Sequence, residues 1–329
     1  MAQVRSDFAE GMKKTGYKYF YEERDQLPEV HPALFREETL DAAWVQWTQV
    51  VEENEPEEKT SELSDAPVSD TVEGFTIYLK ARTFHRRKIW SKETVRDHQK
   101  IENLVQQAVR NWARGSHSKR EKFYAGFFNY GGLTAGRDDT FDNSITGNIT
   151  DPSGDGVYDG TAAAVVPFFN LSGATRSSKL GGTYYNSIVG SLNEGNLETA
   201  LILLEYTNAK SERDLQFDQR ADTMLVPTHL ERTARKLLES PGTASEQHEG
   251  VINPYQNRLK PIVWKYLTDT NAWFVGIAKR GIVMGKRQEP EMTMFIDQRS
   301  GSFEAVYDER YGGTVEDFRP WVASDVSTS

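Results

Sequence analysis

Residues 223–240 of the chain read TMLVPTHLERTARKLLES and contain the clearest local signal in the sequence. The short apolar run Met224–Pro227 predicts a buried strand. Thr228 stands three residues before Glu231, which is the spacing of a capping box at the start of a helix. The apolar side chains that follow have the spacing of an amphipathic helix: Leu230, Ala234, Leu237 and Leu238. We therefore expect a strand that leads directly into a helix.

Elements of both kinds flank this segment. On its N-terminal side, Ser191 and Glu194 form a second capping box, followed by a leucine-rich helical stretch at residues 197–208. On its C-terminal side, short apolar runs predict strands at residues 261–266, 272–277, 292–296 and 303–307, with a further β-like piece near Trp321. Because helices and strands are interspersed along the chain, the predicted fold class is α+β.

The longest predicted helix covers residues 92–114. Ser91 can serve as its N-cap, and Gly115 is the expected end because glycine is common just after a helix. A single apolar stripe supports it: Ile101, Leu104, Val105, Ala108, Val109 and Trp112. At 1.5 Å per residue this helix would be a rod of roughly 33 Å, a length that fits a spine.

Residues 70–92 are predicted to form a long hairpin or extended ribbon. Phe75, Ile77 and Leu79 alternate with other residues in the two-residue period of a strand. The stretch from Lys80 to Lys92 contains six Lys and Arg residues and no acid. We therefore expect the ribbon to have a basic edge or tip.

Residues 1–65 carry isolated aromatic clusters separated by charges. This pattern suits an arm that packs on another surface, or a peripheral segment packed on its own domain. The run at residues 52–65 holds seven acids and one Lys, which is typical of a solvated loop. It can also pair with the basic ribbon, between subunits or within one chain. The expected contact residues are Arg82, Arg86, Arg87, Lys88, Glu52, Glu53, Glu57, Glu58, Trp44 and Trp47.

Composition excludes several classes of protein. The 329 residues are 37% hydrophobic, which is enough for a packed core and argues against wholesale disorder. There is no cysteine, so disulfides, thiolate metal sites and a cysteine nucleophile are excluded. The net charge of -10 is unlike that of a dedicated nucleic-acid-binding protein. We expect neither a secretory signal nor a membrane span, because no apolar run is long enough.

No catalytic constellation is apparent. Gly285 and Lys286 are followed by Arg287, so the pair does not form a phosphate-binding loop. The six histidines are scattered and none belongs to a zinc-binding helix motif. We therefore expect no enzymatic activity, no metal and no cofactor.

The segment at residues 223–240 resembles a signature of the major capsid proteins of tailed bacteriophages. In that family a strand reading LVVP leads into a helix with the pattern LxxxAxxLL, which Leu225–Pro227 and the leucines after it follow. Asn271–Val275, reading NAWFV, resembles the family's AWF strand, and Glu309–Gly313 resembles its terminal strand and turn. The likeness runs in the same order over residues 70–325.

The resemblance implies a Hong Kong 97-like major capsid fold made of five parts. These are an N-terminal arm at residues 1–65, an extended β-hairpin loop at 66–92, a peripheral domain with the spine helix at 93–190, an axial domain at 191–290, and strands that return to the peripheral domain at 291–329.

The resemblance also implies the function of a major capsid protein of a tailed double-stranded DNA phage, located in the virion and assembled in the host cytoplasm. Its copies are expected to form the pentamers and hexamers of an icosahedral head that encloses the genome. The expected partners are a portal protein, a separate scaffolding protein, a decoration protein and packaged DNA contacted without sequence specificity, with no membrane.

Two alternatives stay open at the level of sequence. An encapsulin-like nanocompartment shell protein has the same fold, but such shells lack a long N-terminal arm of this kind. A soluble enzyme with a cryptic carboxylate site would form a small discrete oligomer with a concave pocket.

Overall fold

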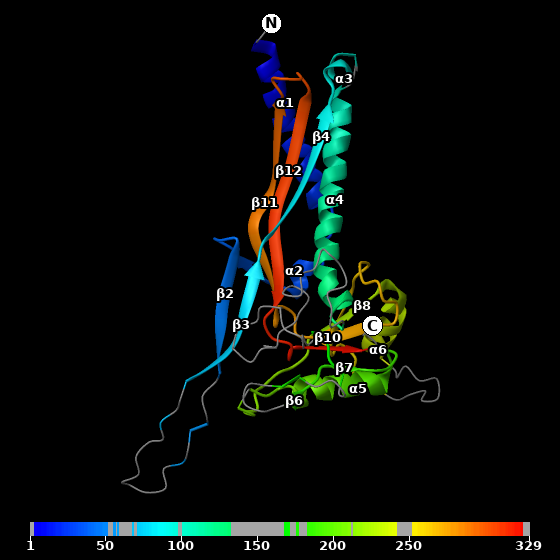
Figure 1. The fold of residues 1–329 in the computed structure, drawn as a ribbon. Coiled ribbons are helices and arrows are strands. Elements are labelled where there is room, and N and C mark those ends of the chain that lie inside the picture. The colour runs from blue at the N-terminus through cyan, green and yellow to red at the C-terminus, as the bar shows by residue number, and fades with distance from the viewer. Residues whose placement is uncertain are drawn as a thin grey trace.

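A computed structural model describes the chain at residues 3–51, 55–56, 58, 68, 71–97, 101–132, 168–171, 176–177, 183–211, 213–241 and 252–324. Within these residues, a long column stands on a globular body, and a two-stranded hairpin projects from their junction (Figure 1).

The column contains a four-stranded sheet. Its strand order is β1 (Arg36–Thr39), β11 (Ile282–Ile296), β12 (Phe303–Val315) and β4 (Arg82–Trp90). Strands β11 and β12 form a long antiparallel hairpin, and β4 pairs antiparallel with the other edge of β12. The domain boundary expected between residues 290 and 291 falls inside β11. The strand runs without interruption across that position, so it does not separate two domains there.

Two helices cover one face of this sheet. α1 (Gln3–Asp25) and α4 (Ile101–Asn129) pack against each other and against β11 and β12. Phe20 of α1 and Trp112 of α4 both contact Tyr307 of β12, with ring centroids 5.5 and 6.2 Å away. The aromatic residues of α1 therefore pack on their own chain. This agrees with the interpretation of the N-terminal residues as a peripheral segment packed on its own domain.

The spine helix does not end at Gly115 as predicted. A short helix, α3 (Lys92–Asp97), comes first, with the Ser91 hydroxyl accepting the Thr94 amide at 3.1 Å as an N-cap should. α4 then runs through Gly115 to Asn129. Buried side chains continue at helical spacing after the glycine: Arg120, Tyr124, Phe127 and Phe128. Their burial outweighs the roughly 1 kcal/mol that a glycine costs inside a helix.

The body is built on a five-stranded sheet. Its strand order is β7 (Ser187–Ile188), β13 (Trp321–Ser324), β10 (Trp273–Gly276), β8 (Thr223–Val226) and β9 (Lys260–Val263). The predicted strand and helix at residues 223–240 are confirmed, since the fully buried β8 leads into α6 (Glu231–Glu239). A second, two-stranded sheet pairs β5 (Arg176–Ser177) with β6 (Thr183–Tyr184).

The predicted capping boxes of the body helices are wrong. Before α6, a 3-10 turn, η2 (Thr228–Leu230), occupies the place of the cap, and no side chain caps either element. α5 (Glu194–Ile202) is capped by Asn193, whose side chain accepts the Asn196 amide at 2.8 Å. It continues as a π-helical turn, η1 (Leu203–Thr207). In both cases the chain enters the helix at a different residue from the one that the motif indicates.

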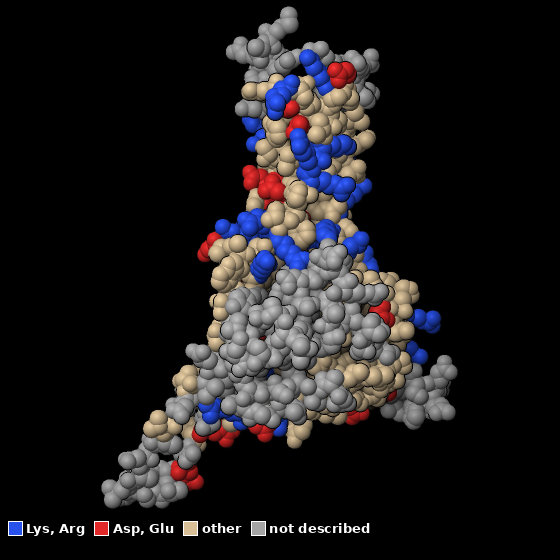
Figure 2. Space-filling view, viewed as in Figure 1, with Lys and Arg blue, Asp and Glu red and all other residues tan. Residues whose placement is uncertain are grey.

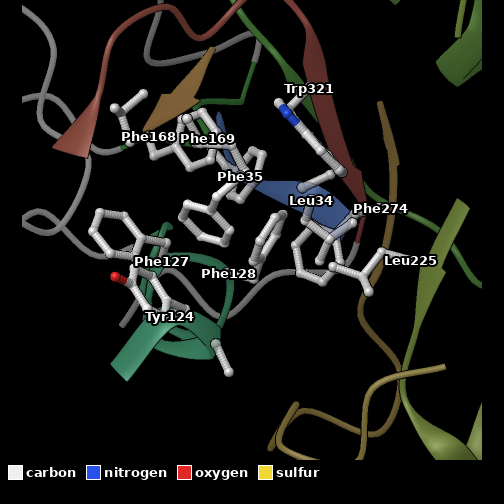
Figure 3. Close-up of a cluster of buried hydrophobic side chains, with 14 of the residues drawn as sticks. Leu34, Phe35, Tyr124, Phe127, Phe128, Phe168, Phe169, Leu225, Phe274 and Trp321 are labelled. Atoms are coloured by element: carbon white, nitrogen blue, oxygen red, sulfur yellow. The ribbon is translucent and has the colours of Figure 1, made fainter. Parts of the chain in front are cut away.

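One aromatic core joins the column to the body. Figure 3 shows side chains from both parts converging: Leu34 of α2 (His31–Leu34), Phe35, Tyr124, Phe127 and Phe128 of α4, Leu225 of β8, Phe274 of β10 and Trp321 of β13. The Phe128 ring lies 5.1 Å from both Phe274 and Trp321. Because α4 ends inside this core, its orientation relative to the body is fixed by packing.

The strand pairing predicted within residues 70–92 is wrong. β2 (Trp44–Val51) pairs with β3 (Val72–Lys80), while β4 pairs with β12. Only Ala81 separates β3 from β4, which is too short for a hairpin turn. The two strands follow one another in nearly the same direction (Figure 1). The projecting hairpin is therefore β2–β3, and the acidic run belongs to the segment that joins these two strands.

Glycines allow the hairpin to cross the column sheet. Gly285 and Gly312 are register partners on β11 and β12. A Cβ at Gly312 would lie 2.1 Å from the carbonyl oxygen of Lys80, and one at Gly285 would lie 2.7 Å from Leu40. Side chains at these positions would push the hairpin away from the sheet. We call this place, defined by Gly285 and Gly312, the glycine crossing.

Candidate interaction surfaces

Strand β4 carries most of the basic run, and its side chains alternate between the two faces of the sheet. Phe84 and Trp90 lie on the face covered by the helices, where Phe84 stacks on Tyr311 with ring centroids 4.4 Å apart. The two-residue period places three cations on the same face: Arg82, Arg86 and Lys88. These cations therefore border α4.

Arg87 lies on the opposite face and is already engaged. One of its terminal nitrogens is 2.6 Å from the Glu304 carboxylate, which is buried. Lys88 lies over the ring of Trp90, with its Nζ 5.5 Å from the ring centroid. Three of the four predicted basic contact residues, Arg82, Arg87 and Lys88, thus have an interaction within their own chain.

A groove runs between β4 and α4. It consists of two adjoining cavities of about 360 Å³ and 340 Å³, which share Phe84 and Lys119 in their walls. Five cations line it: Arg82, Arg86, Lys119, Lys122 and Lys265. We call it the basic groove. The one carboxylate in its described lining is Glu309, which is buried against Arg120.

The cations of the basic groove are accessible. Arg86, Lys119, Lys122 and Lys265 are all exposed, and within the described part of the chain none of these four forms an ion pair. Gly115 widens the groove, since no atom lies within 4 Å of the position that its Cβ would take. Figure 2 shows Lys and Arg atoms gathered along the column and where it meets the body, with few acidic atoms among them.

The contact residues expected from the sequence include Arg82 and Arg86 of this groove but not Lys119, Lys122 and Lys265. Lys119 and Lys122 lie in a basic stretch after Gly115, where the predicted helix ends. Had the helical period been continued past the glycine, it would have placed Gly115, Lys119 and Lys122 on one face. Lys265 follows β9 and approaches only through the tertiary fold, so no local signal marks it.

The predicted acidic contact residues lie between β2 and β3 in sequence, and the structure describes only one of them. Glu52, Glu53 and Glu57 lie outside the described residues. Glu58 is exposed, as is its neighbour Glu55, and neither forms an ion pair with the described part of the chain. Pairing of the acidic run with the basic strand therefore stays a prediction.

The two predicted tryptophans lie on β2 and differ in burial. Trp47 packs with Val45 against a small cluster that includes Leu40 and Leu79, which fastens the hairpin to the column. Trp44 is 54% exposed, and Val50 on the same strand is 66% exposed. The hairpin therefore presents exposed apolar side chains on β2.

A buried polar network lies under the basic groove. Arg120 is 2.6 Å from a Glu309 oxygen, and the other oxygen accepts the Ser116 hydroxyl at 3.0 Å. Burial works to lower the pKa of Arg120, but the opposing charge of Glu309 raises it, so the pair is ionised. Tyr307 donates to Ser116 at 2.7 Å and completes the network. These groups fix the groove floor and are not accessible for chemistry.

A second buried carboxylate joins three segments. Glu121 of α4 accepts the Val30 amide at 2.9 Å and lies 2.7 Å from His31 Nδ1. Its other oxygen accepts the indole N–H of Trp264. Burial works to raise the pKa of Glu121, but its hydrogen bonds and the His31 charge outweigh this and hold the pKa below its ordinary value.

The described residues show neither a metal centre nor a membrane-spanning element. Among them, no three His, Asp or Glu side chains come close enough together to hold a metal ion. None of the described helices is both long and apolar enough to cross a bilayer.

Comparison with known proteins identifies the family. A family model described as phage capsid protein matches residues 74–324. No curated protein matches the sequence.

Solved structures share the fold at low identity. One from Mycobacterium phage Patience has 12% identity and a TM-score of 0.52, covering 98% of this chain and 87% of that one. The capsid of cyanophage P-SCSP1u has 10% identity and a TM-score of 0.52, covering 92% and 89%. One from Microbacterium phage Oxtober96 has 12% identity and a TM-score of 0.51, covering 92% and 93%.

These matches agree with the sequence analysis. The α+β Hong Kong 97-like fold and the assignment as a phage major capsid protein of the virion are confirmed. The family model covers most of the column, the hairpin strand β3 and the whole body sheet, and the chain therefore belongs to the phage capsid protein family.

Proposed function

We propose that copies of this capsid protein associate into pentamers and hexamers, which together build the icosahedral head around a double-stranded DNA genome. Self-assembly into a shell follows from the family. The observation that supports the finer arrangement is the β2–β3 hairpin, which projects from the body and has no core of its own. Its exposed Trp44 and Val50 need a neighbouring surface to cover them.

The body supplies a second set of exposed apolar residues, which supports its role as the axial domain. Ile202 and Tyr206 are 54% and 68% exposed, and both lie on the continuous helix formed by α5 and η1. Val189, which follows β7, is 73% exposed. In this proposal the body, which includes most of the predicted axial residues 191–290, meets its copies around the capsomer axis, and the column, which contains β11 from Ile282, forms the peripheral domain.

The proposed partners are a portal protein, a separate scaffolding protein, a decoration protein and the packaged DNA. The net charge of -10 supports a weak, non-specific contact with DNA, because repulsion lets the genome slide during packaging. Tight binding of DNA by empty shells at physiological salt would contradict this part of the proposal.

We assign no enzymatic activity to the chain. A capsid role needs no catalytic site, and the buried carboxylates Glu121 and Glu309 are engaged in hydrogen bonds within the chain. The encapsulin-like alternative has less support, because the matching family model is that of phage capsid proteins.

Electron microscopy tests the proposal. The chain should be expressed alone and together with the products of its neighbouring genes, and the particles examined by negative stain and then by cryo-microscopy. Closed icosahedral shells with fivefold and sixfold capsomers are expected. Small discrete oligomers in the presence of a scaffolding protein would contradict it and would favour a soluble enzyme.

A further inference from the structure

We propose that the basic groove holds one strand of the enclosed double-stranded DNA by its phosphates. The inference rests on the proposed function, because it requires a genome inside the shell. It goes further in naming the contact site, the cations that form it and the side of the column that faces the genome. Because the whole chain carries a net charge of -10, its attraction to DNA has to be local.

The groove concentrates positive charge that the rest of the chain does not neutralise. Four of its five cations are exposed and form no ion pair within the described residues: Arg86, Lys119, Lys122 and Lys265. The one carboxylate in the described lining belongs to Glu309, and Arg120 already compensates its charge at 2.6 Å. An anion that enters the groove therefore meets cations without an opposing free carboxylate in the described lining.

The density of these charges suits a phosphate backbone better than an acidic peptide. The α4 positions that line the groove run from Asn111 to Lys122, about 17 Å at 1.5 Å per residue. One strand of duplex DNA carries a charge roughly every 3.4 Å along the helix axis, hence about five phosphates over that length. An extended peptide turns only alternate side chains to one face, roughly one per 7 Å, so it offers two or three carboxylates. The cations in the groove match the DNA strand.

The cations stand on both walls of the groove, so a strand between them is contacted from two sides. β4 contributes Arg82 and Arg86, which lie on one face of the strand about 13 Å apart. α4 contributes Lys119 and Lys122 on the opposite wall, and Lys265 approaches from the body. The column and the body therefore share one site for a line of phosphates.

Gly115 is an independent sign that a ligand approaches α4. It lines the groove inside the helix, and no atom lies within 4 Å of the position that its Cβ would take. Glycine inside a helix is less stable than alanine, and no neighbouring group of the described chain requires it here. Glycine is commonly used where a ligand comes close to the backbone. The bare stretch of helix thus allows a DNA strand to come near the floor of the groove.

A contact of this size holds DNA only weakly at physiological salt. With five phosphates neutralised, the logarithm of the affinity falls with the logarithm of the salt concentration at a slope of about -4.5. The affinity then drops roughly 500-fold between about 50 and about 200 mM salt. Such a contact orders the DNA next to the shell and still lets the genome move during packaging and release.

The salt dependence of DNA binding tests the proposal. The natural chain is titrated onto a fluorescent duplex of about 20 base pairs and mixed sequence, and anisotropy is followed from about 25 to about 200 mM salt. The variant K119Q/K122Q should bind roughly tenfold more weakly at about 50 mM salt, and its slope should be smaller by about 2.

The matched control is K236Q/K260Q. It also removes two exposed lysines, but both belong to the body and neither lines the groove. The control should keep the slope of the natural chain. Equal changes in the two variants, or no binding of the duplex by the natural chain at the lowest salt, would overturn the proposal.

Poly-glutamate tests the other kind of anion. Compared at equal charge concentration, it should displace the labelled duplex roughly tenfold less well than unlabelled duplex does, because its carboxylates are more widely spaced on one face. Equal or better displacement by poly-glutamate that K119Q/K122Q abolishes would assign the groove to an acidic protein segment, and the proposal would be wrong.

Cryo-microscopy of the shells shows which way the groove faces. In DNA-filled particles the groove should open toward the genome, with density against Lys119 and Lys122 that empty particles lack. A groove that opens on the outer surface would overturn this proposal while the shell itself supports the proposed function. A chain that forms no shell contradicts the proposed function instead, so the two failures are distinguishable.

Discussion

Arg120 and Glu309 form a buried ion pair, and we expect its one-sided removal to be costly. Their side chains are 8% and 1% exposed. In Arg120→Met the Glu309 charge loses its partner, while Ser116 alone cannot compensate it. We predict a loss of about 3–5 kcal/mol in the free energy of unfolding, measured by urea denaturation.

A double-mutant cycle identifies the cause of that loss. Glu309→Gln removes the charge but keeps a hydrogen-bonding side chain, so R120M/E309Q should be more stable than R120M alone. If the losses of the two single variants simply add, the pair is not coupled, and the effect of Arg120→Met is one of packing.

Glu121 predicts a pH dependence with a definite sign. Because its pKa is lowered in the folded chain, its contribution is fully present above the ordinary carboxyl value of 4.5 and is lost as the pH falls through the lower folded value. The stability difference between the natural chain and Glu121→Gln should therefore be large at pH 7 and shrink below pH 4.5. Urea titrations across this range measure it, and a difference that grows on acidification would contradict the assignment.

At the scale of elements, Gly115 lowers the stability of α4, although no neighbouring atom requires a glycine at this position. Nothing lies within 4 Å of a Cβ at Gly115. Gly115→Ala should therefore stabilise the unassembled chain by about 0.5–1 kcal/mol, because alanine loses less entropy in a helix. Denaturation of the unassembled protein checks this. A loss of stability would mean that the glycine relieves strain in α4.

The glycine crossing predicts the opposite outcome for the same type of substitution. Gly312→Ala places a Cβ 2.1 Å from the backbone oxygen of Lys80, so β3 or β12 must shift. We expect a cost of about 1–3 kcal/mol. We also expect faster proteolysis at the hairpin than in Gly115→Ala, which serves as the matched control. Equal behaviour of the two variants would show that the crossing tolerates a side chain.

The elements with a clean local signal were predicted well, and the failures have physical causes. β8 and α6 follow from the apolar period at residues 223–240 alone. The predicted helix ended too early because glycine is common just after a helix. Burial of Tyr124 and Phe127 instead stabilises a helix that continues past Gly115. The hairpin was assigned to the wrong strands because strand period reveals a strand but not its partner. That pairing depends on contacts far apart in sequence.

At the scale of the whole molecule, assembly should depend on salt. Exposed cations on β4 and exposed acids near the hairpin end attract each other only within the Debye length, which falls from about 10 Å at 0.1 M salt to about 3 Å at 1 M. Shell formation, followed by light scattering, should slow and reach a lower yield over this range. Assembly that strengthens with salt would indicate that burial of Trp44 and other apolar surface dominates.

The candidate contact surface could be predicted only in part. Charge runs in the sequence marked Arg82 and Arg86, but the groove exists because α4 brings Lys119 and Lys122 alongside β4. Arg87 looked equivalent in sequence and is instead paired with Glu304 on the other face. The alternation of faces along a strand separates these residues, and only the pairing of β4 with β12 shows which face is open.

A contact between the projecting β2–β3 hairpin of one copy and the column or body of the next would be head-to-tail, because it joins two different surfaces. Each copy offers one patch and accepts a different one, so copies related by a rotation other than a twofold form a chain of subunits. Such a chain of subunits ends only when the last meets the first. The number of copies in that ring is then determined by the angle between neighbours and not by the strength of each contact. The hairpin leaves the column at the glycine crossing, so a methyl group at Gly312, 2.1 Å from the Lys80 oxygen, would displace the very element that reaches toward a neighbour.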